Sequence, residues 1–77
     1  MNASEIQQRY VLMLLEKVGQ DRFPSADHMD RIEASLATRE QLEAYVELLL
    51  EKVESVRYPS IQMLDRLQRI ATMLPRE

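Results

Sequence analysis

The sequence predicts an all-α fold in which an internally duplicated helical hairpin forms a compact four-helix bundle. The first observation is a repeat: the stretch from Tyr10 to Val18 returns 35 positions later, and 12 of the 27 positions are identical between 10–36 and 45–71. The second is that apolar residues recur at spacings of three and four, which is the period of a helix. The third is composition, because good helix formers dominate and the chain has only one glycine and three prolines.

The first pair of helices is expected at about 5–21 and 26–36. Ser4 and Gln7 fit a capping box, in which the serine hydroxyl accepts from the backbone three residues on and the glutamine reaches back. The corner between the two helices contains a proline, and Ser25 follows it as the expected N-cap. The residues expected to point inward are Tyr10, Val11, Leu14 and Val18 in the first helix, and Met29, Ile32 and Leu36 in the second.

The second pair of helices is expected at about 39–56 and 61–74. Thr38 and Gln41 form a second capping box, and Ser60 is the expected cap of the last helix. The apolar stripe of the third helix is the strongest periodic signal in the chain. The residues expected to point inward are Leu42, Tyr45, Val46, Leu49, Val53 and Val56 in the third helix, and Leu64, Leu67, Ala71 and Leu74 in the fourth.

The repeat makes residues 1–77 a single domain built from two pseudo-repeats, 4–37 and 38–75. A helical hairpin cannot bury its apolar face alone, so the two units are expected to pack on each other. We expect an approximate two-fold relation that closes them into a bundle. The alternative is an open pair of stacked hairpins, as in a solenoid, for which two repeats are few. The spacing is near that of tetratricopeptide repeats, but their Trp-Leu-Gly-Tyr signature is absent.

Composition argues against several classes of protein. The chain has no cysteine, which rules out disulfides and thiolate metal sites, and its net charge of −3 disfavours broad contact with nucleic-acid phosphates. The longest apolar run, Tyr10–Leu15, is too short for a membrane span and no secretory signal is visible, so a cytoplasmic location is expected. The chain has no phosphate loop or nucleophile motif. We therefore expect no enzyme activity, catalytic residue, cofactor, metal or small-molecule substrate.

An Arg-aromatic-Pro-Ser corner is the most distinctive motif, with Arg22 and Phe23 in the first repeat and Arg57 and Tyr58 in the second. The structural interpretation is that the aromatic ring plugs the end of the bundle, while the arginine lies near a helix C-terminus, where the helix dipole favours a cation. The functional interpretation is that these four residues form two clamps that face a ligand.

The candidate partner-binding residues lie on the first and third helices: Leu12, Leu15, Glu43, Glu47 and Glu51. Leu12 departs from the repeat because its twin is Glu47, and with Leu15 it could form a small apolar patch. The three glutamates occupy the sector opposite the apolar stripe, either as a solvated face or as a docking surface for a basic partner or a second copy. The expected function is a small non-enzymatic protein-interaction or assembly module. It would bind a protein partner or itself through the first helix, with a homodimer as one form.

The alternative function is a nucleic-acid-associated transcriptional regulator of helix-turn-helix type, since each unit is a hairpin with a tight corner. Its phosphate contacts would come from Arg66, Arg69 and Arg76, of which Arg66 and Arg69 are expected to point outward from the fourth helix. The acidic net charge makes a nucleic-acid partner the less favoured interpretation.

Overall fold

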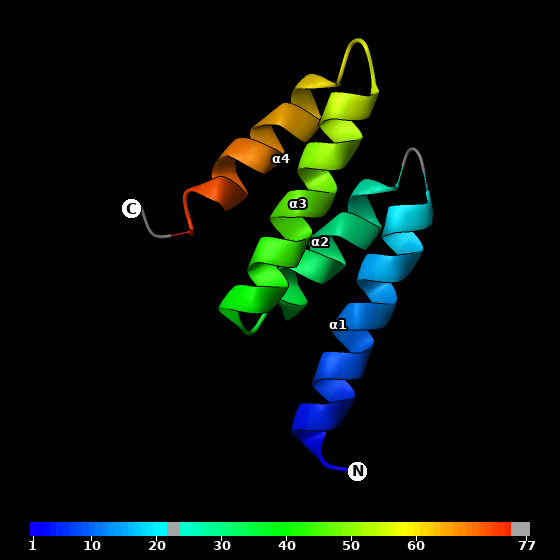
Figure 1. The fold of residues 1–77 in the computed structure, drawn as a ribbon, viewed down its shortest axis with the longest axis vertical. Helices are drawn as coiled ribbons and strands as arrows, with labels where there is room; N and C mark the ends of the chain where they lie inside the picture. Colours follow the sequence, from blue (N-terminus) through cyan, green and yellow to red (C-terminus); the bar gives the residue numbers. More distant parts are fainter. Residues whose placement is uncertain (22–23, 75–77) are drawn as a thin grey trace.

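The computed structural model describes residues 1–21 and 24–74 of the chain. Within these residues it contains no strand and four helices: α1 (Ala3–Gln20), α2 (Ala26–Ser35), α3 (Arg39–Ser55) and α4 (Ile61–Ala71) (Figure 1). The predicted all-α class and compact four-helix fold are confirmed. In the described part of the chain, no helix combines the length and the apolar character needed to cross a membrane.

Side chains at the helix starts explain where the helices begin. The expected caps Ser25, Thr38 and Ser60 are confirmed, because each hydroxyl accepts a hydrogen bond from the backbone N–H three residues on. Ser4, the expected first cap, lies inside α1 instead. The cap is Asn2, whose amide oxygen accepts from the Glu5 N–H at 2.9 Å. Asparagine caps as strongly as serine, so α1 begins earlier than predicted.

The fourth helix departs from the prediction in its end and in its buried face. α4 ends at Ala71 rather than Leu74, and the Thr72 hydroxyl donates to a carbonyl of the last turn as the chain leaves the helix. Ile70 is 1 % exposed and belongs to the core, whereas Leu64 is 42 % exposed and Ala71 is also exposed. The prediction is confirmed at Leu67 and Leu74, which are half-buried against the core, and wrong at Leu64 and Ala71. The reason is that α4 turns Ile70 inward and leaves the side that carries Leu64 at the edge of the molecule.

The two hairpins lie side by side in the same orientation (Figure 1). α1 and α3 run in the same direction, and α2 and α4 both return from their corners in the opposite sense. Contacts join α1 to α2, α3 to α4 and α1 to α3. The hairpins are therefore stacked, which is the arrangement that the sequence left as the alternative to two-fold closure. The stack is flat, with extents of 43 × 31 × 17 Å.

Side chains from all four helices meet in one core. Its completely buried members are Val11, Ile32, Tyr45, Leu49 and Ile70. The expected inward stripe of α3 is confirmed most clearly, since Tyr45 and Leu49 are both without exposed surface. The periodicity that predicted α3 therefore also predicted the centre of the fold.

The corner between α3 and α4 does not form the expected plug. Tyr58 is 83 % exposed, and the guanidinium carbon of Arg57 lies 5.6 Å from the centre of its ring. The ring is therefore covered only by its neighbour in the sequence and not by the end of the bundle. The matching pair in the first corner, Arg22 and Phe23, lies outside the described residues.

Candidate functional site

The contact between α1 and α3 holds the two hairpins together. A methyl group of Leu48 lies 3.4 Å from the position that a Cβ on Gly19 would take, which is an ordinary van der Waals distance, so the two helices pack against each other at this point. The Lys52 ammonium donates to the Gly19 carbonyl at 3.4 Å. Nearer the helix N-termini, the side-chain amides of Gln7 and Gln41 bond to each other at 3.3 Å.

A polar cluster joins α2 of the first hairpin to α3 and α4 of the second. The Arg66 guanidinium donates to Asp30 at 2.7 Å and to Glu33 at 2.5 Å, and Arg69 donates to Glu33 at 2.6 Å. The Tyr45 hydroxyl also donates to Glu33, at 2.6 Å. The side chains of Arg66 and Glu33 are only 13 % and 12 % exposed. The expected outward direction of Arg66 is therefore wrong, because this side chain belongs to the contact between the hairpins.

Two side chains of this cluster have shifted pKa values. Burial, reinforced by the hydrogen bond to the Glu33 carboxylate, raises the pKa of the Tyr45 hydroxyl well above its ordinary value of 10.0. Burial lowers the pKa of Arg66, but the bonds to Glu33 and Asp30 outweigh it and raise the net value. Neither group titrates near neutral pH, so both suit a structural link better than acid–base chemistry.

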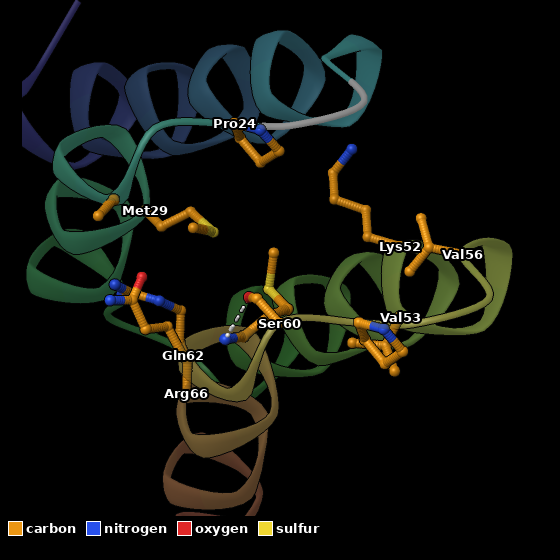
Figure 2. Close-up of a pocket in the computed structure, with 11 residues that line it drawn as sticks. Pro24, Met29, Lys52, Val53, Val56, Ser60, Gln62 and Arg66 are labelled. Carbon is orange, nitrogen blue, oxygen red and sulfur yellow. Dashed lines mark hydrogen bonds between the residues drawn. The ribbon is translucent and has the colours of Figure 1, made fainter.

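A cavity of about 230 Å³ lies between the hairpins near their corners. Figure 2 shows Pro24 and Met29 of the first hairpin opposite Val53 and Val56 of the second. The cations on its wall are already bonded to the protein: Lys52 to the carbonyls of Gly19 and Asp21, and Arg66 to Asp30 and Glu33. Ligand pockets are usually larger, at about 300–1,000 Å³. We interpret this cavity as a gap between the stacked hairpins.

The five predicted partner-binding residues do not form one site. Leu12 is 61 % exposed, but Leu15 is only 8 % exposed and belongs to the core. The expected apolar patch of two leucines therefore reduces to Leu12. Both residues line a groove between α1 and α3, together with Gln8 and Ala44.

The glutamates of α3 divide between two surfaces. All three predicted positions are exposed: Glu43, Glu47 and Glu51. Glu51 lines a groove beside Gly19 on the α1 side of the helix. Glu43 and Glu47 instead share a surface with Leu74, which follows α4, and Glu43 accepts a 2.9 Å bond from Arg39.

Comparison of the two repeats identifies a surface that the sequence reasoning missed. Leu15 and Met29, which are buried in the first hairpin, correspond to Leu50 and Leu64 in the second. Leu50 is only half-buried and Leu64 is exposed, because no further hairpin covers them in the described part of the chain. We call this surface the end face and define it by six residues: Leu42, Glu43, Glu47, Leu50, Glu54 and Leu64. The 35-residue repeat in the sequence could have revealed this surface, because a stack of repeats leaves the last unit uncovered.

The opposite end of the stack shows the complementary exposure. α3 contacts α1 through the side that carries Gln41 and Leu48, and these residues correspond to Ile6 and Met13 of α1. Ile6 and Met13 are exposed. We call this surface the outer face and define it by Ile6, Arg9, Tyr10, Met13 and Lys17. Each end of the molecule thus presents side chains whose counterparts in the middle form the contact between the hairpins.

Comparisons of the chain with protein-family models, with curated proteins and with solved structures found no match.

Proposed function

We propose that the protein is a non-enzymatic protein-interaction module that binds a helical partner on its end face. The observation that carries this proposal is that Leu64 is exposed and Leu50 only half-buried at positions where the first hairpin buries Met29 and Leu15. A repeat unit with an uncovered apolar face gains stability when another unit or a partner covers it.

The first hairpin indicates how a partner would bind. α3 lies along α1 and covers Leu15, so a partner helix would lie along α3 in the same way and cover Leu50. Glu43 and Glu47 beside this leucine would favour a partner with basic residues, because complementary charges speed encounter and fix the register. Of the three glutamates predicted to form an acidic docking surface, the proposal therefore uses Glu43 and Glu47 but not Glu51.

Site-specific photo-cross-linking in the native cell tests the proposal. A benzophenone amino acid in place of Glu47 reports on the end face, and the same amino acid in place of the exposed Tyr58 is the matched control. We expect protein adducts from position 47 and not from position 58, whether the adduct holds another protein or a second copy of this chain. Equal labelling from both positions, or no adduct from position 47, would contradict the proposed function.

The helix-turn-helix alternative depended on Arg76, which lies outside the described residues, and on Arg66 and Arg69. Both guanidinium groups are bonded to Glu33, and Arg66 is also bonded to Asp30. We therefore do not propose a nucleic-acid partner. The proposed location stays cytoplasmic, as the sequence led us to expect.

A further inference from the structure

We propose that the end face is covered by the outer face of a second copy of this chain, in a head-to-tail contact that repeats the contact between the two hairpins. This inference rests on the proposed function, because it names the partner of the same surface. In it, α1 of the second copy takes the place on α3 that α3 itself takes on α1 (Figure 1). The register follows from the 35-residue repeat.

The repeat register first places similar residues where α3 contacts α1. Tyr10 of the second copy takes the place of Tyr45, Met13 that of Leu48 and Lys17 that of Lys52. Lys52 donates to the Gly19 carbonyl, and the repeat partner of Gly19 is Glu54. Lys17 would therefore meet a carboxylate in addition to backbone carbonyls.

At one position the contact between the hairpins and the proposed contact between copies differ, and there the residues on both surfaces change together. Gln7 and Gln41 bond to each other between the hairpins, and their counterparts in the new contact are Leu42 and Ile6. A polar pair is thus replaced by an apolar pair, so neither residue would bury an unpaired polar group. Ile6 is exposed in the single chain and Leu42 is half-buried, so this contact would remove apolar surface from water.

Charge gives the strongest support for the register. Ala44 lies beside Leu12 and Gln8 in the groove between α1 and α3. The counterpart of Ala44 is Arg9, and the counterparts of Leu12 and Gln8 are Glu47 and Glu43. The contact of Ala44 with two uncharged side chains therefore becomes a contact of one cation with two anions between copies. Glu40 lines the same groove, and its counterpart Glu5 adds a third carboxylate at the edge of the contact. This complementarity explains why the twin of the exposed Leu12 is a glutamate.

The contact between copies would retain part of the polar cluster that joins the two hairpins. The ion pair of Arg66 with Asp30 corresponds to a pair of Arg31 with Asp65, and both of these residues are exposed in the single chain. Glu33 accepts hydrogen bonds from Tyr45 and Arg69 within the chain. In the contact between copies, Gln68 takes the place of Glu33 and Ala34 takes the place of Arg69. Tyr10 keeps an acceptor there, whereas both ion pairs of Glu33, with Arg66 and with Arg69, are lost. The contact between copies should therefore be weaker than the contact within the chain.

The two faces are different surfaces, so the contact is heterologous and does not close on itself. Successive copies would continue the stack as a solenoid of hairpins. A symmetric dimer through α1 would instead stop at two chains.

Sedimentation velocity at low ionic strength, over a range of concentrations, tests this inference. We expect the mass of the unmodified chain to rise past that of a dimer. Arg9→Glu and Glu47→Arg each place like charges in the contact and should weaken association at least about tenfold. Both residues are exposed, so neither change should alter the fold, and Arg57→Glu in the corner is the matched control with unchanged association.

An equimolar mixture of the Arg9→Glu and Glu47→Arg chains provides the decisive comparison. The first variant keeps an intact end face and the second an intact outer face, so the mixture should associate although each variant alone does not. If the mass of the unmodified chain stops at two chains, or if the mixture of variants stays monomeric, the inference is overturned. If the unmodified chain is monomeric while position 47 cross-links to another protein, the proposed function stands and the head-to-tail contact is wrong.

Discussion

The Tyr45 hydroxyl donates a 2.6 Å hydrogen bond to the Glu33 carboxylate and so ties α3 of the second hairpin to α2 of the first. The same carboxylate accepts from Arg66 and Arg69 of α4. Glu33 therefore bonds to both helices of the second hairpin at once. A largely buried carboxylate needs all of these donors, so a shifted or rotated hairpin would leave it unpaired. We infer that this cluster fixes how the hairpins stack.

The first prediction concerns Glu33. Glu33→Gln removes the charge that pairs with the largely buried Arg66 and should lower the free energy of unfolding by about 2 kcal/mol or more. Glu43→Gln is the matched control, because its pair with Arg39 is exposed and should contribute less than about 0.5 kcal/mol. Urea denaturation of the two variants measures the difference. Equal losses would show that the cluster does not hold the hairpins together.

The second prediction concerns alkaline pH. Because the pKa of Tyr45 is raised in the folded chain, the unfolded chain releases this proton first as the pH rises above 10.0. The contribution of the Tyr45 hydroxyl to the free energy of unfolding is fully present below that pH. Above it, the contribution falls by up to about 1.4 kcal/mol per pH unit. Tyr45→Phe should make the alkaline decline shallower, as followed by thermal unfolding between pH 8 and 11. Tyr58→Phe, in the exposed corner, should leave the decline unchanged.

The third prediction separates the two leucines of α1. Leu15→Ala removes a core side chain and should cost about 2–3 kcal/mol of unfolding free energy. Leu12→Ala should change stability by less than about 0.5 kcal/mol, because Leu12 is mostly exposed. Chemical denaturation of both variants is the measurement. A large loss at Leu12 would mean that this residue is covered in solution.

The fourth prediction concerns the helix starts. Ser60→Ala removes the oxygen that accepts from the Met63 N–H and should cost about 1 kcal/mol. Ser4→Ala should change stability by less than about 0.5 kcal/mol, because Asn2 caps α1. Thermal unfolding of the two chains compares them directly. A greater loss at Ser4 than at Ser60 would place the first cap where the sequence suggested.

Local chemistry explains which parts of the fold were predictable from the sequence. The caps Ser25 and Ser60 need only a hydroxyl at the start of a helix, and the inward direction of Tyr45 and Leu49 follows from the period of α3. These features depend on residues within one or two turns of each other. They hold whichever way the hairpins pack.

The remaining features depend on how the hairpins are placed, which the helical period does not determine. Two-fold closure and stacking bury the same stripes, so the sequence could not decide between them. Leu64 was expected inside with the other apolar residues of the fourth helix, yet only a further hairpin would cover it. The bonds of Arg66 to Asp30 and Glu33 join residues far apart in the sequence and exist only in the stack. The end face was missed for the same reason.

The central claim is that the ends of the molecule repeat the contact in its middle, and thiol cross-linking tests it most directly because the chain has no cysteine. Gly19→Cys with Leu48→Cys places two thiols at the contact between α1 and α3, and a short bis-maleimide should join them within one chain. Met13→Cys with Glu54→Cys places two thiols at the equivalent positions of the outer and end faces. This second variant should give a ladder of cross-linked dimers, trimers and larger species. A second variant that stays monomeric while the first closes internally would contradict the account.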